Sequence, residues 1–362
     1  MKVYIVAILI TIIMSFVYSK QIKSSFTLKN KIYIITVFVV LFLVSALRAK
    51  TVGTDTPSYY YRVSYIAKRG IDFNLLLSQK APLYDLIMFL FSKILPAKQL
   101  YQIVSSLIIE GLFACYIIKC SDNYFISTWI FLMQYLFFQS LNVSRQFMAV
   151  ALVAYAISEL IQSEKTKKAF IIMILAVGIH STALVALPIL LLTGKRERFL
   201  RIYTGIISSL VILYPLLLKV FVSLFPKYSF YLNGRFFETG KNRKIILTLF
   251  QLLFWIYAIY IYNRNKKRMK EQDEKKYKCV LYISFIGIII GFAALKSILI
   301  TRLEYYYSIS FLVLAPITIK YSGENKKIVS FSLIIIMSIP GLFLLQSGNG
   351  GILPYSFFWE HF

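Results

Sequence analysis

Four ionisable side chains in apolar or aromatic surroundings carry the chemistry that this sequence could perform. They are Asp55, Arg145, His180 and Arg302. An ionisable side chain inside hydrocarbon is costly, so one that is retained beside apolar runs is a candidate for function. A carboxylate and an imidazole can move protons, and two guanidinium groups can bind phosphate oxygens. Together these groups suit an anionic, phosphate-containing ligand.

Arg145 lies between two apolar runs, in Ser140-Leu-Asn-Val-Ser-Arg-Gln. A guanidinium beside Asn142, Ser144 and Gln146 at a helix start would bind an oxyanion bidentately, which suits phosphate better than a lysine does. The alternative is an arginine at a helix end whose charged head extends to the membrane surface. The sequence leaves both interpretations open.

His180 lies in the middle of an apolar stretch, beside Ser181 and Thr182. Its reference pKa of about 6.5 makes histidine the usual residue for moving a proton at neutral pH. The alternative is a neutral histidine whose ring is hydrogen-bonded to a backbone carbonyl. We predict His180 as a catalytic base and keep the structural alternative open.

Arg302 opens the segment Arg302-Leu-Glu-Tyr-Tyr-Tyr, with Glu304 near it and Lys296 one loop back. Tyrosines such as Tyr305 to Tyr307 are typical of the interface between membrane and water. Tyrosines beside an arginine can also hold sugar rings and pyrophosphate, by stacking and by ionic hydrogen bonds. We therefore predict Arg302 and Tyr306 as substrate-binding residues.

Asp55 stands between two threonines and before Pro57, where it could simply cap a short helix. Alternatively it is a functional carboxylate at the membrane surface, kept ionised by Arg48, Lys50 and Arg62 nearby. A base, or a ligand for an acceptor hydroxyl, would have this environment.

The elements that must position these residues are membrane helices. Of the 362 residues, 59% are hydrophobic, 17% aromatic and 15% charged, which excludes a water-soluble fold. Apolar runs near the roughly 17 to 20 residues needed to cross a bilayer recur along the chain. We predict an all-α integral membrane protein, one polytopic domain over 1–362 with about 10 to 12 transmembrane helices. The predicted segments are 3–19, 32–47, 83–95, 99–118, 124–141, 146–162, 170–192, 202–225, 245–262, 279–295, 304–319 and 328–346.

The basic residues of short loops predict the orientation, because such loops stay in the cytoplasm. This rule places the loops at 20–31, 195–201, 263–278 and 320–327 inside. Alternation then places outside the two larger loops, 48–82 and 226–244, together with 296–303, the N-terminus and the C-terminal tail. Asp55 and Arg302 are therefore expected on the outer side.

One loop conflicts with simple alternation. The basic loop 164–168 also belongs inside, yet only one apolar stretch, 169–192, separates it from 195–201. That stretch is interrupted at 178–181, so it can form a re-entrant pair of half-helices with His180 at an outward tip. The run at 83–95 is short enough not to cross. Ten spans result if neither crosses, and twelve if both do.

The formal net charge is +26, from 41 Lys and Arg against 15 Asp and Glu. The basic residues are spread over short loops, which excludes a nucleic-acid surface and suits contact with anionic membrane lipid. An excess of positive charge in the outer loops suits an anionic ligand. It comprises Lys227, which we predict to bind substrate, and Arg235, Lys241, Arg243 and Lys244. The three cysteines have no metal-ligand or redox spacing.

Six motifs in order resemble the EpsG-type, Wzy-like family of bacterial membrane polysaccharide polymerases. They are Arg48 with Gly53-Thr-Asp-Thr-Pro-x-Tyr, Ser144-Arg-Gln-Phe-Met-Ala, Gly178-Ile-His-Ser-Thr-Ala-Leu followed by Pro188, Lys227-Tyr-x-x-Tyr, Arg302-x-x-x-Tyr-Tyr, and Pro354-Tyr. The resemblance extends over nearly the whole chain. The chain differs from the family at Lys80-Ala-Pro-Leu, where such proteins often carry an acidic residue.

The resemblance implies transfer of a growing glycan from an undecaprenyl-pyrophosphate carrier onto the next lipid-linked repeat unit, at the outer face of the bacterial cytoplasmic membrane. Arg145 and Arg302 would bind pyrophosphate, with Gln146 beside them. His180 or Asp55 would act as base, and Arg48 would orient the loop. No cofactor is expected, and no metal, since the sequence has no DxD-like motif. Other glycan-export proteins are expected as partners.

Three other functions remain open at the level of sequence. A flippase or transporter of lipid-linked oligosaccharide would share the basic outer surface, but repeat symmetry between halves is expected of it and is not visible. Another membrane transferase, a ligase or an acyltransferase, shares nearly all of these features. A scaffold protein would lose abundance, but no chemistry, when its outer arginines are replaced.

Overall fold

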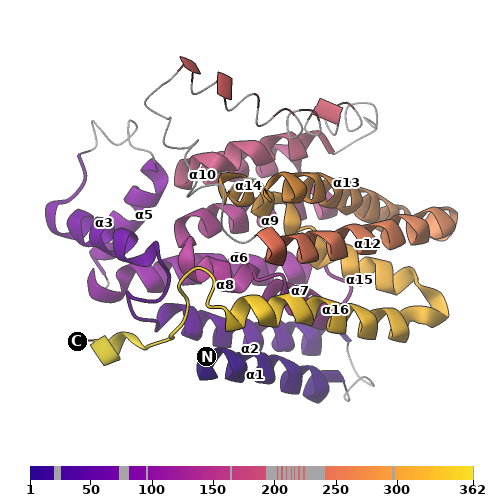
Figure 1. Cartoon of the computed structure of the whole chain (residues 1–362), viewed down its shortest axis with the longest axis horizontal. Helices are drawn as coiled ribbons and strands as arrows, with labels where there is room; N and C mark the ends of the chain where they lie inside the picture. The colour runs from indigo at the N-terminus through magenta and orange to yellow at the C-terminus, as the bar shows by residue number, and fades with distance from the viewer. Residues whose placement is uncertain are drawn as a thin grey trace.

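The computed structural model is a bundle of helices whose long axes run roughly parallel (Figure 1). It describes residues 1–19, 26–72, 81–94, 97–163, 165–192, scattered positions between 202 and 224, 241–295 and 298–361. Within these residues there is no β-strand, only an isolated bridge between Arg48 and Phe357. The helices are α1 Lys2–Ser19, α2 Phe26–Ala46, α3 Thr56–Arg69, α5 Pro82–Ser92, α6 Ala97–Cys120, α7 Tyr124–Met133, α8 Leu136–Asn142, α9 Ser144–Ser163, α10 Thr166–Ile179, the 3-10 helix η1 Ser181–Leu192, α12 Lys241–Asn265, α13 Glu271–Ala293, α14 Ile298–Ser308, α15 Phe311–Tyr321 and α16 Lys326–Gln346.

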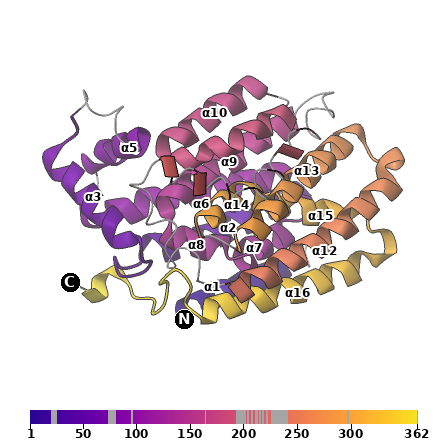
Figure 2. The ribbon, with the colours of Figure 1, turned by 45° about the horizontal axis from the view of Figure 1, so that its top comes forward.

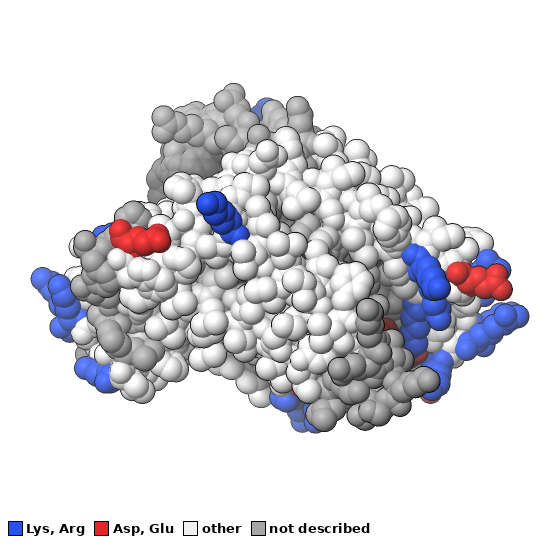
Figure 3. Space-filling view, turned by 90° about the horizontal axis from the view of Figure 1, so that it is seen from below, with Lys and Arg blue, Asp and Glu red and all other residues white. Residues whose placement is uncertain are grey.

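The bundle has two chemically different ends. Both chain termini, α3 and α5 lie at one end, which we call the site end (Figure 2). The connections from α12 to α13 and from α15 to α16 lie at the other, which we call the basic end. On the face in Figure 3 most charged side chains lie toward the two ends, and a broad uncharged area separates them. This distribution suits a protein whose middle is in hydrocarbon.

The fold class predicted from the sequence, an all-α integral membrane protein, is confirmed. Five described helices, α6, α9, α12, α13 and α16, are long and apolar enough to cross a bilayer, judged by length and composition. Their outward faces are apolar as well, and Ile328 and Phe331 of α16 are 68% and 66% exposed. Such faces suit contact with lipid chains. The total of ten to twelve crossings stays a prediction.

Two segments predicted as continuous helices are divided, so that part of the prediction is wrong. The segment 124–141 ends its first helix at Met133 and resumes at Leu136, because Tyr135 has a left-handed φ of 66°. The segment 304–319 is divided into α14 and α15 at residues 309 and 310. Neither break contains glycine or proline, so the usual sequence signal for a helix break is missing.

The interruption predicted at 178–181 is confirmed. Helix α10 ends at Ile179, His180 has an extended backbone, and η1 begins at Ser181 and packs against α10. At the start of α10, Lys168 forms an ion pair of 3.1 Å with Glu159 of α9. The segment beyond Leu192, including the predicted loop 195–201 and most of the predicted helix 202–225, lies outside the described residues.

Helix α5 is short, as predicted for the run 83–95. Its 11 residues span about 16 Å, roughly half of the hydrocarbon thickness. It packs against α3, α6 and α10 at the site end. Together α3 and α5 form a cap there, within what the sequence predicts as the outer loop 48–82 and the run that follows it.

At the basic end, three helix ends are joined by ion pairs. Asp122 lies 2.6 Å from Lys276 and 2.8 Å from Lys320, and Asp273 lies 2.7 Å from Lys320. The helices also extend into the predicted loop 263–278, which shrinks to a connection at 266–270. The acidic residues in the first turn of α13 favour this extension, because they face the positive end of the helix dipole.

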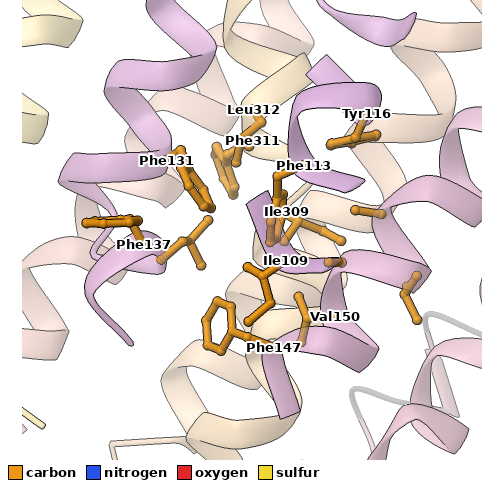
Figure 4. Packing of buried hydrophobic residues seen from close by; sticks show 14 of the residues in the cluster. Ile109, Phe113, Tyr116, Phe131, Phe137, Phe147, Val150, Ile309, Phe311 and Leu312 are labelled. Atoms are coloured by element: carbon orange, nitrogen blue, oxygen red, sulfur yellow. The ribbon is translucent and has the colours of Figure 1, made fainter. Parts of the chain in front are cut away.

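Aromatic and aliphatic side chains of α6, α7, α8, α9 and α15 pack together in the core (Figure 4). Phe113 and Phe131 pack with their ring centroids 4.7 Å apart, and both are fully buried. Fully buried alanines along α9 allow its neighbours to approach closely, as small residues do between membrane helices. The close packing holds the site end to the rest of the bundle.

Gly341 provides a test of this packing. A Cβ atom there would lie 2.5 Å from the carbonyl oxygen of Met133, where α16 crosses α7. We expect Gly341→Ala to destabilise the protein by about 1 to 3 kcal/mol, because the backbone must shift to relieve the overlap. Gly111→Ala is the control, since no described atom lies within 4 Å of its Cβ. Thermal unfolding in detergent measures both, and equal midpoints for the two variants would contradict the close packing.

Candidate functional site

The first loop of the site end is held by a glycine contact. Gly53 has a φ of +96°, and a Cβ atom there would lie 2.7 Å from the carbonyl oxygen of Leu141. Its N–H donates to Gly351 at 2.9 Å, and that of Thr54 donates to Gly350 at 3.0 Å. Only glycine accepts both this conformation and this approach easily. The predicted motif therefore anchors the loop between α8 and the C-terminal tail.

Asn142 at the end of α8 fixes the start of α3. Its Oδ1 accepts from the backbone N–H of Asp55 at 2.9 Å and from the hydroxyl of Thr54 at 3.0 Å. Asp55 stands at the N-cap position of α3 but makes no capping hydrogen bond. Its carboxylate is therefore available for other partners.

The charged partner of Asp55 is Arg302. The Nη2 atom of Arg302 lies 3.5 Å from Oδ2 of Asp55, with 42% of the Arg302 side chain and 32% of the Asp55 side chain exposed. The sequence analysis expected Arg48, Lys50 and Arg62 to be the cations around Asp55, but the described ion pair is with Arg302. The guanidinium of Arg48 bonds Ser45 and Ser144, and Arg62 pairs with another acid. Residues far apart in the sequence thus form the ion pair.

Arg145 lies at the start of α9 between two tyrosine rings. Its guanidinium carbon is 5.6 Å from the ring centre of Tyr59 and 5.8 Å from that of Tyr84. No described carboxylate forms an ion pair with it. The next residue, Gln146, donates from Nε2 to the carbonyl oxygen of Arg302 at 2.5 Å. This bond joins the start of α9 to α14 and holds the two predicted phosphate-binding arginines in one region.

His180 is connected to α14 by two hydrogen bonds. Its Nδ1 lies 2.7 Å from the hydroxyl of Thr182, which lies 3.0 Å from the hydroxyl of Tyr306. Both Arg145 and Arg302 lie within electrostatic range of the His180 ring. The structure therefore brings together Asp55, Arg145, His180 and Arg302, with Gln146 and Tyr306 as hydrogen-bonding neighbours.

Arg48 is placed differently from the other predicted binding residues. Its side chain is 1% exposed and donates to the carbonyl oxygen of Ser45 and, at 3.1 Å, to the hydroxyl of Ser144. Tyr101 lies beneath it, with 5.8 Å to the ring centre. These contacts connect the end of α2 to the start of α9, so Arg48 positions the site rather than facing ligand. Lys227 lies outside the described residues.

Asp85 is a charged residue of the site end that the sequence analysis missed. Oδ1 of Asp85 accepts from Nε of Arg62 at 2.7 Å, and a second bond completes a bidentate pair between α5 and α3. The hydrogen bond with Asp85 raises the pKa of Arg62 above its ordinary value. The sequence does contain a signal for Asp85, because this acid interrupts an apolar run just as Arg145 and His180 do.

A polar cavity of about 450 Å³ adjoins the charged residues. Arg302 and Asn142 form part of its wall, so the cavity meets the Asp55–Arg302 pair. The other polar and aromatic side chains of the wall are mostly uncharged. They include Gln134, Gln139, Gln251, Glu304, Tyr305 and Ser308. Donors, acceptors and an aromatic ring in one cavity of this size suit a polar organic ligand.

An apolar groove is lined in part by residues that neighbour the site residues in the chain. It has a volume of about 470 Å³ and runs between α5, α6, α9 and α10. Its wall includes Leu83 and Ile179, which directly precede Tyr84 and His180 in the chain. Leu107 and Leu175, which are 54% and 42% exposed, mark its open side. An alkyl or isoprenoid chain is the kind of ligand that such a wall accommodates.

The described residues contain no group of three or more His, Cys, Asp or Glu side chains able to hold a metal ion. The three cysteines are unpaired, and Cys120 and Cys279 lie apart from the charged cluster, near the basic end. Apart from tyrosines, the ionisable groups of the described site are two arginines, a histidine and the carboxylates of Asp55 and Glu304.

Fold and site together define a membrane protein that combines a cationic cluster with a polar cavity and an apolar groove. The chain belongs to the EpsG family, whose family model matches residues 31–357. Membership indicates a membrane protein of the polysaccharide-polymerase type with glycosyltransferase-like character. A search of curated proteins and a search of solved structures each returned no match.

We predict that the Arg62–Asp85 pair stabilises the cap formed by α3 and α5. Asp85 is 5% exposed, so Asp85→Asn alone leaves Arg62 without its partner and should cost about 1 to 2 kcal/mol. This is less than for a fully buried pair, because Arg62 is 37% exposed. Arg62→Gln combined with Asp85→Asn should recover part of the loss. A double-mutant cycle on thermal unfolding measures the coupling, and strict additivity would show that the pair does not hold the cap.

Proposed function

We propose that this protein is a repeat-unit polymerase for a bacterial cell-surface polysaccharide, an exopolysaccharide or a capsule. It transfers a growing glycan from an undecaprenyl-pyrophosphate carrier onto a lipid-linked repeat unit at the outer face of the cytoplasmic membrane. The observation that carries the proposal is the arrangement of Arg145, Arg302, Asp55 and His180 between a polar cavity and an apolar groove. A substrate with a lipid chain, a pyrophosphate and sugars matches these three parts in order.

The reaction breaks the bond between the anomeric carbon of the donor glycan and a pyrophosphate oxygen. A new bond forms between that carbon and a hydroxyl oxygen of the acceptor sugar. Negative charge develops on the leaving pyrophosphate, and the guanidinium groups of Arg145 and Arg302 stabilise it. The protein must also hold donor and acceptor in line, which contributes a large share of rate enhancement in such reactions.

The acceptor hydroxyl loses its proton as the new bond forms, and His180 is our candidate for the base. Its Nδ1 is hydrogen-bonded to Thr182, which orients the ring and leaves Nε2 to take the proton. Asp55 is the weaker candidate, since its carboxylate is already engaged by the guanidinium of Arg302. In this scheme Asp55 holds Arg302 in place and accepts a hydrogen bond from the acceptor sugar.

The apolar groove supports the lipid part of the proposal. Its wall includes Ile179 and Leu83, whose neighbours in the chain are His180 and Tyr84, and the Tyr84 ring packs against Arg145, so a chain lying in the groove would have Arg145 near its polar head. The exposed Leu107 and Leu175 give the groove an apolar open side on the surface of the bundle. An isoprenoid chain could thus enter from the membrane while its pyrophosphate reaches the cationic cluster.

The first test is the length of the glycan in cells. We expect deletion of the gene to leave single repeat units on the lipid carrier, and Arg145→Ala to reproduce this loss at matched membrane abundance. Arg264→Ala, at the basic end of α12, is the control and should leave chain length unchanged. A gel of lipid-linked material measures all three. Long chains in cells without the protein would overturn polymerisation and direct attention to transport or to another transferase.

The second test separates the two candidate bases. We expect His180→Ala to lower polymer formation by about 100-fold or more, because it removes general base catalysis. Asp55→Asn should have a smaller effect, chiefly through a misplaced Arg302. Polymer amount per unit of membrane protein is the readout, with Thr182→Val as a variant expected to lie between wild type and His180→Ala. If polymer formation survives in both His180→Ala and Asp55→Asn, neither residue is the base.

A further inference from the structure

The break between α7 and α8 lies in the wall of the polar cavity. Helix α7 ends at Met133, Tyr135 has a φ of 66°, and α8 begins at Leu136. A non-glycine residue in this conformation is strained, and such strain persists where surrounding contacts enforce it. The hydroxyl of Tyr135 donates to the carbonyl oxygen of Asn349 at 2.9 Å, which is one such contact. Gln134, which directly follows α7, forms part of the cavity wall.

Gln134 is the unusual residue of this wall. Its side chain is 6% exposed, yet neither its amide nitrogen nor its amide oxygen has a hydrogen-bond partner among the described residues. An unsatisfied buried polar group costs about 1 to 3 kcal/mol, so proteins rarely keep one without a reason. An amide offers one donor group and one acceptor group side by side. A sugar hydroxyl, which both donates and accepts, is a complementary partner.

The rest of the wall combines further polar side chains with aliphatic ones, Leu136, Val143, Leu247 and Leu344. Gln139 and Gln251 bring further amides, Glu304 brings a carboxylate, and Tyr305 brings an aromatic ring that packs on Phe147 with 5.0 Å between ring centres. Arg302 supplies the positive charge of the described wall, at the side where Asp55 lies. A second phosphate would meet no further described cation there, and a lipid chain would bury these amides unpaired. Neutral sugar rings fit the wall better than either.

We propose that this cavity is the glycan-recognition site and that Gln134 is a specificity-determining residue that contacts the sugar. The inference rests on the proposed function for the identity of the lipid-linked substrate. Because Arg302 belongs both to the cavity wall and to the cationic cluster, a sugar ring in the cavity lies beside a pyrophosphate bound by that arginine. The cavity therefore binds and selects the sugars nearest the pyrophosphate. The groove accepts the polyprenyl chain without selecting among carriers.

The test compares two variants and two probes. Gln134→Leu removes the amide from the cavity, and Gln102→Leu is a matched control. Gln102 of α6 is buried as well, and its amide has no hydrogen-bond partner among the described residues. It does not line the cavity. The probes are lipid-linked repeat units extracted from cells that lack this protein, and undecaprenyl pyrophosphate without sugar. The affinity of each probe is measured for the purified full-length wild type and for each variant in nanodiscs.

We expect wild type and Gln102→Leu to prefer the sugar-bearing probe, and Gln134→Leu to lose about 10-fold in affinity for that probe alone. Equal loss for both probes, or no loss, would overturn the role of Gln134. A wild-type protein that binds both probes equally would overturn the cavity as a glycan site. Deletion of the gene could leave long glycan chains while Gln134→Leu still loses the preference for the sugar-bearing probe. That result would support the glycan site and overturn the proposed polymerase function.

Discussion

The buried guanidinium of Arg48 is the interaction on which the site end depends. It connects the end of α2, through the carbonyl oxygen of Ser45, to the start of α9, through the hydroxyl of Ser144. This arginine is 1% exposed, and each of its two terminal nitrogens donates to one of these acceptors, so the two helix ends are held where the acceptors lie. The residue after Ser144 is Arg145, and the loop after Arg48 carries Asp55. One desolvated charge thus sets the positions of two charged groups that face the ligand.

Hydrocarbon imposes the second constraint, because backbone groups exposed to lipid must be hydrogen-bonded within their own helix. Irregular backbone is tolerated only where protein surrounds it or where it lines a cavity. The breaks at Tyr135, at His180 and between α14 and α15 obey this rule, since each lies inside the bundle beside the cavity, the charged cluster or the core. In this chain the departures from regular helix and the candidate site coincide.

Sequence alone predicted the helical class, the interruption near His180 and the grouping of Asp55, Arg145, His180 and Arg302, because an ionisable residue in an apolar run is conspicuous. It did not predict which charges pair. Asp55 was assigned to nearby cations, whereas Arg302 reaches it through the fold. The break at Tyr135 was also missed, since a tyrosine in a left-handed conformation leaves no local signal and is enforced by distant contacts. Gln134 was also missed, because its place in the cavity wall depends on the same fold and leaves no local signal in the sequence.

The tail that follows α16 completes the first loop of the site. Gly350 and Gly351 provide the carbonyl oxygens that Gly53 and Thr54 bond, and Tyr4 of α1 bonds the carbonyl oxygen of Ile352. During synthesis, the loop at Gly53 leaves the ribosome long before these acceptors exist. The loop can therefore acquire its final geometry only after almost all of the described chain has been made and inserted. A ribosome-bound or truncated chain would hold its lipid-facing helices without a finished site, which delays chemistry until assembly is complete.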